Sequence, residues 1–341
     1  MRAWIIPAGA GAGPSGLKLV DRPSPPVAAG QVKVAMRAWS TNYRDGAVAA
    51  GLYLGGPVAV DTVPLSDGAG EVIEVGAGVT RFKLGDRVAG TFFQNWIGGP
   101  FSAAVLGSDL GGPIQGVLAE EAVLDEQGLV AIPCHMSFEE AACLPCAAVT
   151  AWHALFAAGH QILPGQTVLV QGTGGVSIFA LQLAKGAGAD VIVTSSSDEK
   201  LKTAKALGAD DVINYKTTPA WDEAALALTG GRGVDMVIEV GGPGTVARSM
   251  NAVAAGGTVS LIGVLAGMDG AVTPLPLMLK VARLQGVYVG SRAMFEVMNT
   301  AMERQALRPR IDKVFKFEAA PDAYVHQASG AHFGKVVIAA G

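Results

Sequence analysis

A glycine-rich turn carries the clearest chemistry in this sequence. Residues 172–177 read Gly-Thr-Gly-Gly-Val-Ser, after an apolar run over 167–170 and before an apolar-periodic segment over 178–187. This order predicts a strand, a tight turn and the N terminus of a helix. Glycines let the backbone approach a phosphate, and the unpaired N–H groups of a helix N terminus bind its charge. The turn therefore predicts a dinucleotide site formed by Gly172, Thr173, Gly174, Gly175 and Val176.

The flanks of this turn strengthen the prediction. Ser177 stands where the usual pattern has Gly or Ala, so the turn alone is weak evidence. A second strand-like run over 191–194 follows about 20 residues after the turn. That spacing brings the end of the second strand beside the adenosine ribose of a dinucleotide.

The end of the second predicted strand indicates which dinucleotide binds. A carboxylate there would bind the free 2′-hydroxyl of NAD, but residues 194–197 read Thr-Ser-Ser-Ser. Small hydroxyls and a nearby cation suit a 2′-phosphate, so NADP(H) is favoured. The alternative is that the serines cap a helix beginning near Asp198, and both roles are compatible. The predicted contacts to this end of the cofactor are Ser195, Ser196, Lys200 and Tyr215.

Composition places the chain among globular enzymes. Its 341 residues suggest two domains, and with 50% apolar and only 16% charged residues a large core or an oligomer interface is expected. A net charge of −4 without basic runs argues against nucleic acid or a membrane surface as partner. The most apolar segment, 141–159, predicts a buried helix and not a membrane span, because it contains proline and histidine. The first residues predict a strand and not a secretory signal, so the expected location is cytoplasmic.

The cysteines and histidines do not predict a metal site. Cys134, Cys143 and Cys146 are too few for a disulfide scaffold, and no histidine has the spacing that would complete a tetrahedral site. Cys143 and Cys146 form a C-x-x-C pattern inside an alanine-rich segment. Two buried thiols are favoured there over a redox pair.

The order of segments predicts two domains of different class. Residues 1 to about 125 contain short strands separated by glycine and proline, which is typical of an antiparallel, barrel-like domain. From about 147 to 290, strands and helices alternate, which predicts a doubly wound parallel sheet whose last strand spans 286–290. A helix over 293–303 and strands near 314–317 and 334–338 then return to the first domain. A ligand is expected in the cleft between the domains.

Several segments also resemble a known family along the whole chain. They span residues 40–45, 65–72, 79–88, 150–155, the glycine turn and 334–337. On these segments the sequence resembles the medium-chain dehydrogenase/reductase superfamily, in particular its zinc-free quinone-oxidoreductase-like branch. The resemblance implies an NAD(P)-binding Rossmann domain over 147–290. It also implies a GroES-like catalytic domain over 1–146 that is completed by 291–341.

Departures from the family pattern concern its metals. Zinc-dependent members bind a catalytic metal through two cysteines and a histidine, and the matching positions here are Asn42, Ser66 and Cys146. The lobe that holds a structural zinc in relatives matches residues 91–116, which contain no cysteine. The family's threonine and histidine proton relay has no counterpart over 44–48. The resemblance therefore implies an enzyme without zinc.

The resemblance also assigns roles to individual residues. Asn42 is expected beside the nicotinamide and Tyr43 as a donor to substrate, with a turn-capping amide and a buried, packed aromatic as the alternatives. Thr150 and Gly263 are expected near the nicotinamide, although a helical threonine is often only packed. Lys335 is expected to reach the pyrophosphate, and the alternative is a solvated surface lysine.

Other charged residues have mainly structural interpretations. Asp45 and Asp67 are expected to pair with Arg44 or Arg81, and a general acid is the less favoured role for either. Arg292 is a weaker candidate for contact with cofactor or substrate.

Together these features predict an NADP(H)-dependent, zinc-independent oxidoreductase that transfers hydride to a quinone or an α,β-unsaturated carbonyl. Such acceptors are already electrophilic, so hydrogen-bond donors suffice to activate them. The alternatives are an NAD(P)-dependent alcohol or aldehyde dehydrogenase and a cofactor-binding protein with little catalysis. The apolar run 287–289 in the last predicted parallel strand would be a liability if exposed, and relatives pair this strand across a two-fold axis, which predicts a homodimer.

Overall fold

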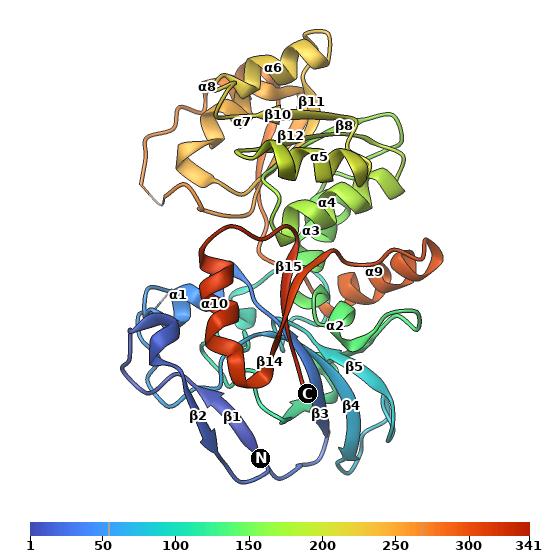
Figure 1. The fold of residues 1–341 in the computed structure, drawn as a ribbon. Coiled ribbons are helices and arrows are strands. Elements are labelled where there is room, and N and C mark those ends of the chain that lie inside the picture. Colours follow the sequence, from blue (N-terminus) through green and yellow to red (C-terminus); the bar gives the residue numbers. More distant parts are fainter. Residues whose placement is uncertain (54, 268) are drawn as a thin grey trace. The chain divides into compact units, whose positions relative to one another are not determined.

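The computed structural model describes residues 1–53, 55–267 and 269–341. The chain forms two compact units (Figure 1). One unit, here called the split unit, consists of Met1–Val149 and Gly290–Gly341, and the other, the Rossmann unit, of Thr150–Val289. The Rossmann unit is thus inserted in the sequence between the two parts of the split unit.

The Rossmann unit is a parallel sheet with helices on both faces. Its strands lie in the order β10-β9-β8-β11-β12-β13, and all neighbouring strands run parallel. The order changes direction between β8 and β11, as in doubly wound dinucleotide-binding sheets, so the predicted fold class is confirmed. The strands are β8 (Thr167–Gln171), β9 (Asp190–Ser195), β10 (Asp211–Asn214), β11 (Val234–Glu239), β12 (Val253–Leu261) and β13 (Arg283–Gly286).

Helices cover this sheet because its central strands are apolar on both faces. Val168, Leu169 and Val170 of β8 are each 0% exposed, as expected for the middle of a parallel sheet. Helices α4 and α5 lie on one face, and α6 and α7 on the other (Figure 1). The helices are α4 (Gly175–Gly186), α5 (Asp198–Ala206), α6 (Trp221–Leu228), α7 (Val246–Ala252) and α8 (Leu275–Lys280).

The last parallel strand lies earlier than the sequence pattern predicted. The structure places β13 at Arg283–Gly286, whereas the apolar pattern predicted a strand over 286–290. Val289 has a φ of 51°, which lies outside the β region and is strained for a β-branched residue. Val287 and Val289 bury their side chains after the strand has ended. The exposed edge of the sheet is therefore β13 and not the apolar run that follows it.

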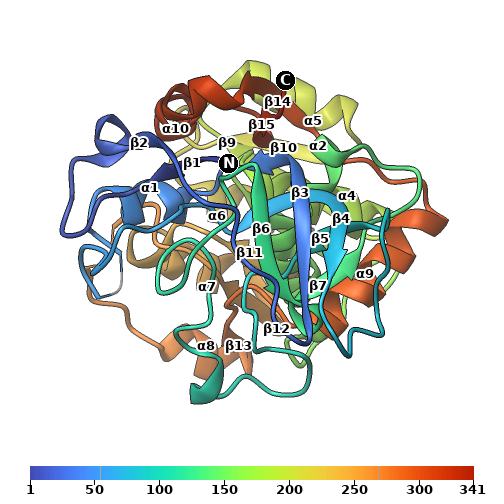
Figure 2. The ribbon, with the colours of Figure 1, turned by 90° about the horizontal axis from the view of Figure 1, so that it is seen from below.

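The split unit is built on a mainly antiparallel sheet. Its strands lie in the order β14-β15-β3-β4-β5-β7, with β6 paired to β3, and β14–β15 is a parallel pair. Figure 2 shows β3, β4 and β5 side by side. The returning chain completes the sheet because β15 pairs with β3, with Val337 opposite Ser40. The strands are β3 (Gln31–Ser40), β4 (Asp67–Val75), β5 (Arg87–Gly90), β6 (Glu121–Asp125), β7 (Leu129–Ala131), β14 (Ile311–Lys316) and β15 (Lys335–Ala339), and a separate pair is formed by β1 (Arg2–Ile5) and β2 (Lys18–Asp21).

Short helices complete the split unit: α1 (Tyr43–Ala49), α2 (Phe138–Ala141), α9 (Arg292–Arg304) and α10 (Ala320–Ala328). The stretch predicted as one buried helix alternates between two helix types. Around α3 (Val149–Trp152), π-helical turns span Leu144–Ala148 and His153–Ala157. Such turns are rare and are often found at functional sites. Within the described residues, no helix combines the length and the apolar character that crossing a membrane requires.

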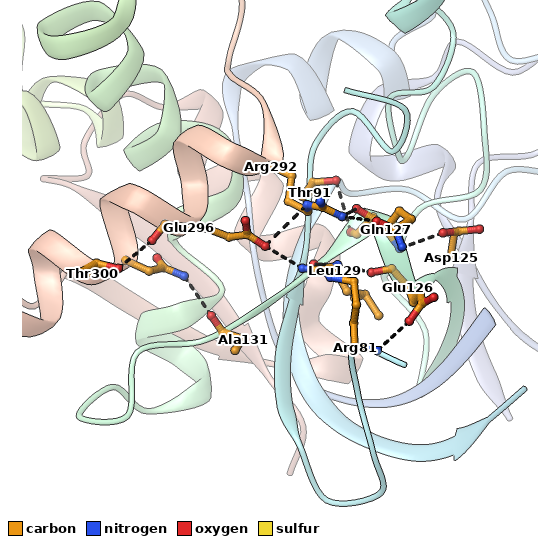
Figure 3. A network of polar contacts seen from close by, with 12 residues as sticks. Arg81, Thr91, Asp125, Glu126, Gln127, Leu129, Ala131, Arg292, Glu296 and Thr300 are labelled. Carbon is orange, nitrogen blue, oxygen red and sulfur yellow. Dashed lines mark hydrogen bonds and ion pairs between the residues drawn. The ribbon is translucent and has the colours of Figure 1, made fainter. Parts of the chain in front are cut away.

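A polar network fastens α9 to the sheet of the split unit (Figure 3). The Arg81 guanidinium donates to Glu296 Oε1 at 2.6 Å, and Arg292 donates to the side chain of Gln127. Arg292 Nε also lies 3.5 Å from Glu296 Oε1. Arg292, a weak candidate for ligand contact from sequence, therefore has its acceptors within the split unit.

Candidate functional site

The glycine turn lies at the carboxyl end of β8. Gly172 has a φ of 72°, in the left-handed region that glycine adopts without strain. Helix α4 begins at Gly175 with Gly174 at its N-cap, and no side chain in the described part of the chain caps it. Its first N–H groups can therefore bind an anion. Ser177 Oγ donates to Gln171 O at 2.7 Å, so the serine at the atypical position ties the helix to the preceding strand.

A buried carboxylate joins this turn to the loop after β11. Glu239, the last residue of β11, is 0% exposed. Gln171, which directly precedes the glycine turn, donates to it from Nε2 at 2.7 Å. The donors to this carboxylate, here called the Glu239 cluster, are Gln171 Nε2, the N–H groups of Gly241 and Gly242, and the hydroxyls of Thr245 and Ser249. Sequence reasoning missed Glu239, whose only signal was an acid at a strand end, separated by one residue from Gly-Gly-Pro-Gly.

Gly263 lies after β12 beside the Glu239 cluster. The Ile262 N–H donates to Glu239 O at 2.8 Å, and a Cβ on Gly263 would lie 2.7 Å from Val240 O. Only glycine allows such a close approach of backbones. The structure therefore brings Gly263 and the glycine turn to the same edge of the sheet. Thr150 is buried at the start of the Rossmann unit, and its contact with the nicotinamide stays a prediction.

Ser195 and Tyr215, two of the residues predicted at the adenosine end, are brought together. Ser195 ends β9 and accepts the Tyr215 N–H on its carbonyl oxygen at 3.1 Å. The Tyr215 side chain is 42% exposed, so its ring can lie against a ligand. Ser196 follows directly and is partly exposed. The contacts of these residues with a cofactor stay predictions.

Ser197 caps a helix, which is the alternative role that the sequence allowed for these serines. Ser197 is the N-cap of α5 and accepts the Lys200 N–H at 3.4 Å. Asp198, the first acid after β9, accepts from Asn214 Nδ2 at 2.6 Å. Helix capping therefore accounts for Ser197, and the Ser195 hydroxyl accepts the Ser197 N–H at 3.3 Å, whereas Ser196 is not the cap.

In the split unit, Lys335 and Asn42 are in direct contact. Lys335 Nζ donates to Asn42 Oδ1 at 2.6 Å and to Thr41 O at 2.7 Å. The lysine is only 3% exposed, so the solvated-lysine alternative is wrong. A contact of Lys335 with the cofactor pyrophosphate stays a prediction, and the structure gives its ammonium other partners.

Asp67 completes a buried polar group, here called the Lys335 cluster, with Asn42, Ser66, Cys146 and Lys335. Asp67 is 0% exposed, and its Oδ2 lies 3.9 Å from Lys335 Nζ and accepts the Cys146 N–H at 3.2 Å. Ser66 Oγ donates to Asp67 Oδ1 at 2.7 Å. Burial raises the pKa of Asp67, while the Lys335 charge acts in the opposite direction. Leu65 directly before this segment has a strained φ of 67°, as is common beside functional sites.

The residues of α1 differ in part from their predicted contacts. Arg44 forms an ion pair with Asp109 at 2.5 Å, and its charge also counters the rise that burial causes in the pKa of the neighbouring Asp45, as expected for a network of Arg44 with Asp45. The predicted pairing of Asp67 with Arg44 or Arg81 is wrong, because Asp67 lies beside Lys335 and Arg81 pairs with Glu296. Asp45 also accepts the Asn42 N–H at 2.6 Å. Burial raises the pKa of Asp45 from 3.8 to about 7. Tyr43 is 61% exposed, so the buried-aromatic alternative is also wrong, while its role as a donor stays a prediction.

Comparison with known proteins assigns the family. The alcohol dehydrogenase GroES-like domain family matches residues 28–134, and the zinc-binding dehydrogenase family matches residues 175–304. Over 315 residues the chain is 47% identical to a zinc-type alcohol dehydrogenase-like protein of Schizosaccharomyces pombe, covering 91% of this chain and 90% of that protein. The chain belongs to the medium-chain dehydrogenase/reductase family.

Solved structures of this family share the whole fold. A candidate alcohol dehydrogenase of Sinorhizobium meliloti 1021 is 43% identical, with a TM-score of 0.90 and 99% of both chains covered. An NAD-dependent alcohol dehydrogenase is 33% identical, with a TM-score of 0.89 and 100% of both chains covered.

Two further medium-chain relatives carry reductase names. A quinone oxidoreductase of Pseudomonas syringae is 28% identical, with a TM-score of 0.83, covering 99% of this chain and 100% of that one. A 2-octenoyl-CoA carboxylase reductase, solved with NADP and 2-octenoyl-CoA, is 26% identical, with a TM-score of 0.88, covering 99% and 87%.

The positions matched to the family's catalytic zinc ligands lie in the Lys335 cluster. Asn42, Ser66 and Cys146 lie around Asp67 and Lys335, and a buried ammonium opposes a second cation there. Burial raises the pKa of the Cys143 thiol to about 12 and raises that of Cys146 as well. No group of three or more His, Cys, Asp or Glu side chains in the described ranges is arranged to hold a metal. The donor set fits zinc poorly because only Cys146 of the three matched positions offers a zinc ligand, and burial disfavours its thiolate.

Aromatic side chains hold the segment that matches the family's structural zinc lobe. Phe93 contacts Trp96 edge-on with ring centroids 6.2 Å apart, and Trp96 contacts Phe101 at 5.1 Å. The Arg44 guanidinium lies 4.7 Å from the centroid of Phe92, which itself packs on Phe93 at 4.8 Å. Packing and a cation–π contact therefore stabilise this lobe.

Proposed function

We propose that the protein is an NADP(H)-dependent oxidoreductase that reduces a quinone or an α,β-unsaturated carbonyl without zinc. The Lys335 cluster carries the proposal. At the positions matched to zinc ligands it has an amide, a hydroxyl and a thiol, beside a lysine that is only 3% exposed. Without a Lewis acid, an unactivated alcohol or ketone is a poor substrate, whereas a conjugated carbonyl already accepts hydride.

The proposed reduction adds one hydride and one proton to the substrate. When bound, NADPH supplies the hydride. As hydride adds to the conjugated acceptor, an electron pair moves onto the carbonyl oxygen, and one proton then completes the reduction. Asn42 and Tyr43 are the proposed hydrogen-bond donors to that oxygen, on which negative charge develops.

The Rossmann unit supports a preference for NADPH. The uncapped N terminus of α4 fits a pyrophosphate, and the end of β9 offers Ser195 and Ser196 where an acid would favour NAD. Tyr215 lies beside Ser195 with an exposed ring. Solved relatives include an NAD-dependent enzyme and a reductase complexed with NADP, so the family accommodates both cofactors.

The proposal is tested by NADPH consumption with a panel of quinones, enones, aldehydes and alcohols, with and without a chelator. Chelator-insensitive turnover of quinones or enones is expected. Turnover confined to alcohols or aldehydes, or lost on chelation, would contradict the proposal.

A second candidate is an alcohol or aldehyde dehydrogenase. Its support is the name of the relative that is 47% identical and of the solved NAD-dependent enzyme. Oxidation of simple alcohols with NADP in the same panel would favour it. Binding of NADPH without turnover of any substrate would favour a third candidate, a cofactor-binding protein with little catalysis.

We also propose that the protein forms a homodimer through β13. This strand ends the Rossmann sheet, and all four of its residues are exposed, with Leu284 at 41%. An unprotected edge strand readily pairs with another strand. Light scattering at micromolar concentration is expected to give the mass of a dimer, and a monomer would contradict the pairing.

A further inference from the structure

We infer that Lys335 is a positioning residue, which holds the Asn42 amide by its oxygen so that Nδ2 is presented as a hydrogen-bond donor to the substrate carbonyl. The inference deepens the proposed function and rests on it. It assigns Asn42 the role of donor and not of acceptor, and it gives Lys335 a role within the split unit.

The chemistry of lysine fixes the orientation of the amide. Lys335 Nζ lies 2.6 Å from the atom of Asn42 that is assigned as Oδ1. An ammonium donates hydrogen bonds and cannot accept them, so the facing atom must be the oxygen. Nδ2 is therefore the atom of the amide that does not bind Lys335.

The other end of the amide has no well-formed hydrogen bond within the part of the chain that the structure describes. Asn42 Nδ2 is buried, and among the described residues it makes no hydrogen bond of normal geometry. Against the effect of burial, a side-chain hydrogen bond from Asn42 lowers the pKa of Asp67, so this carboxylate is the acceptor within reach of Nδ2, although in poor geometry. A buried donor without a well-formed hydrogen bond costs free energy. A ligand that accepts from Nδ2 would recover this free energy, and such groups are often found at catalytic sites.

The ammonium is itself held firmly. Lys335 Nζ donates to Thr41 O at 2.7 Å and lies 3.9 Å from Asp67 Oδ2. Lys335 begins β15, which is paired to β3 up to Ser40. A charged donor on Oδ1 also polarises the amide, which makes Nδ2 a stronger donor. Lys335 thus both orients Asn42 and strengthens its proposed hydrogen bond.

Three variants separate these roles. Asn42→Asp keeps an acceptor for Lys335 but removes the Nδ2 donor, and Asn42→Ala removes both. Each is expected to lower kcat by roughly 100-fold, as for loss of one oxyanion donor. Lys335→Met is expected to lower kcat by roughly 10-fold, with the Kd for NADPH changed less than about threefold. Lys316→Met is the matched control, because Lys316 is an exposed lysine on the neighbouring strand β14, and wild-type kcat is expected.

The double variant Asn42→Ala/Lys335→Met tests whether Lys335 acts through Asn42. The expected kcat equals that of Asn42→Ala within about twofold, because the contact is already lost. Fully additive losses would overturn the inference. A roughly 10-fold rise in the Kd for NADPH on Lys335→Met, with kcat unchanged, would also overturn it and favour a pyrophosphate contact.

One further measurement does not depend on turnover. A crystal structure of Lys335→Met is expected to show a rotated Asn42 amide, and an unchanged amide would overturn the inference. If that variant does not fold, Lys335→Met/Asp67→Asn removes the unpaired carboxylate and serves in its place. Because the crystal structures require no substrate, failure of the quinone and enone panel is distinguishable from failure of this inference.

Discussion

The two units are organised around buried ions of opposite charge. In the Rossmann unit, the Glu239 carboxylate accepts hydrogen bonds from five groups. In the split unit, the Lys335 ammonium donates to Thr41 and Asn42, and the latter lies 293 positions away in the sequence. The Glu239 cluster orders loops at one sheet edge, whereas the Lys335 cluster joins residues from distant segments. Cofactor-binding geometry is thus more locally encoded than the predicted catalytic geometry.

Removing the carboxylate of the Glu239 cluster tests whether this buried ion organises the Rossmann unit. Glu239→Ala leaves several buried donors without an acceptor, so the free energy of unfolding is expected to fall by about 3 kcal/mol or more. NADPH affinity is expected to fall with it, because Gln171 directly precedes the glycine turn. Urea unfolding and NADPH titration check both effects. Glu223→Ala removes an exposed acid from α6 and is the control, with a change below about 0.5 kcal/mol. An equally small change for Glu239→Ala would deny this residue its organising role.

The pH dependence of stability tests the buried charges of the split unit. Burial raises the pKa of Asp45 from 3.8 to about 7, so between these values the folded protein holds a proton that the unfolded chain has released. The contribution of Asp45 to stability therefore falls as the pH rises through this window, by up to about 1.4 kcal/mol per pH unit, and levels off above it. Urea unfolding from about pH 5 to about pH 8 is expected to show this fall, and Asp45→Asn should flatten it. An identical slope in the variant would assign the pH dependence to other groups.

The smallest expected effect concerns the rim of the Rossmann unit. Ser196→Asp places a carboxylate at the end of β9, so NADPH should bind about 10-fold more weakly and NADH better, at about 1.4 kcal/mol for each factor of ten. Stability is expected to stay within about 0.5 kcal/mol. Ser197→Asp is the matched control, since aspartate also caps a helix and adds the same charge one residue further on. Kinetics that are unchanged with both cofactors would argue against the NADPH assignment.

The Rossmann fold was predictable because its determinants are contiguous. The glycine turn and the strand at 190–195 belong to one βαβ unit, so spacing alone placed them. Glu239 was not predicted because its link to the glycine turn depends on Gln171, 68 positions away, whose side chain reaches it only in the folded sheet. The last strand was misplaced because an apolar run such as 287–289 fits either a strand or a buried loop. The left-handed conformation of Val289 cannot be read from its type.

The split unit was predicted less completely. Asn42 and Lys335 were each singled out by resemblance, but for contacts with different parts of the cofactor. Their mutual contact depends on the pairing of β15 with β3, which joins the two ends of a long sequence. The ion pairs were predicted from residues close in sequence, whereas Arg44 pairs with Asp109 and Arg81 with Glu296. Long-range partners of this kind require the fold.

The pairing of β15 with β3 also orders events during synthesis. Residues 150–289, the whole Rossmann unit, leave the ribosome before Lys335 does. Domains generally fold as units while the chain is being made, starting from the N terminus. Asn42 and Asp67 emerge early and remain without their cation while an entire second domain is translated. A nascent chain would thus hold a finished Rossmann sheet before its lysine-centred cluster could form.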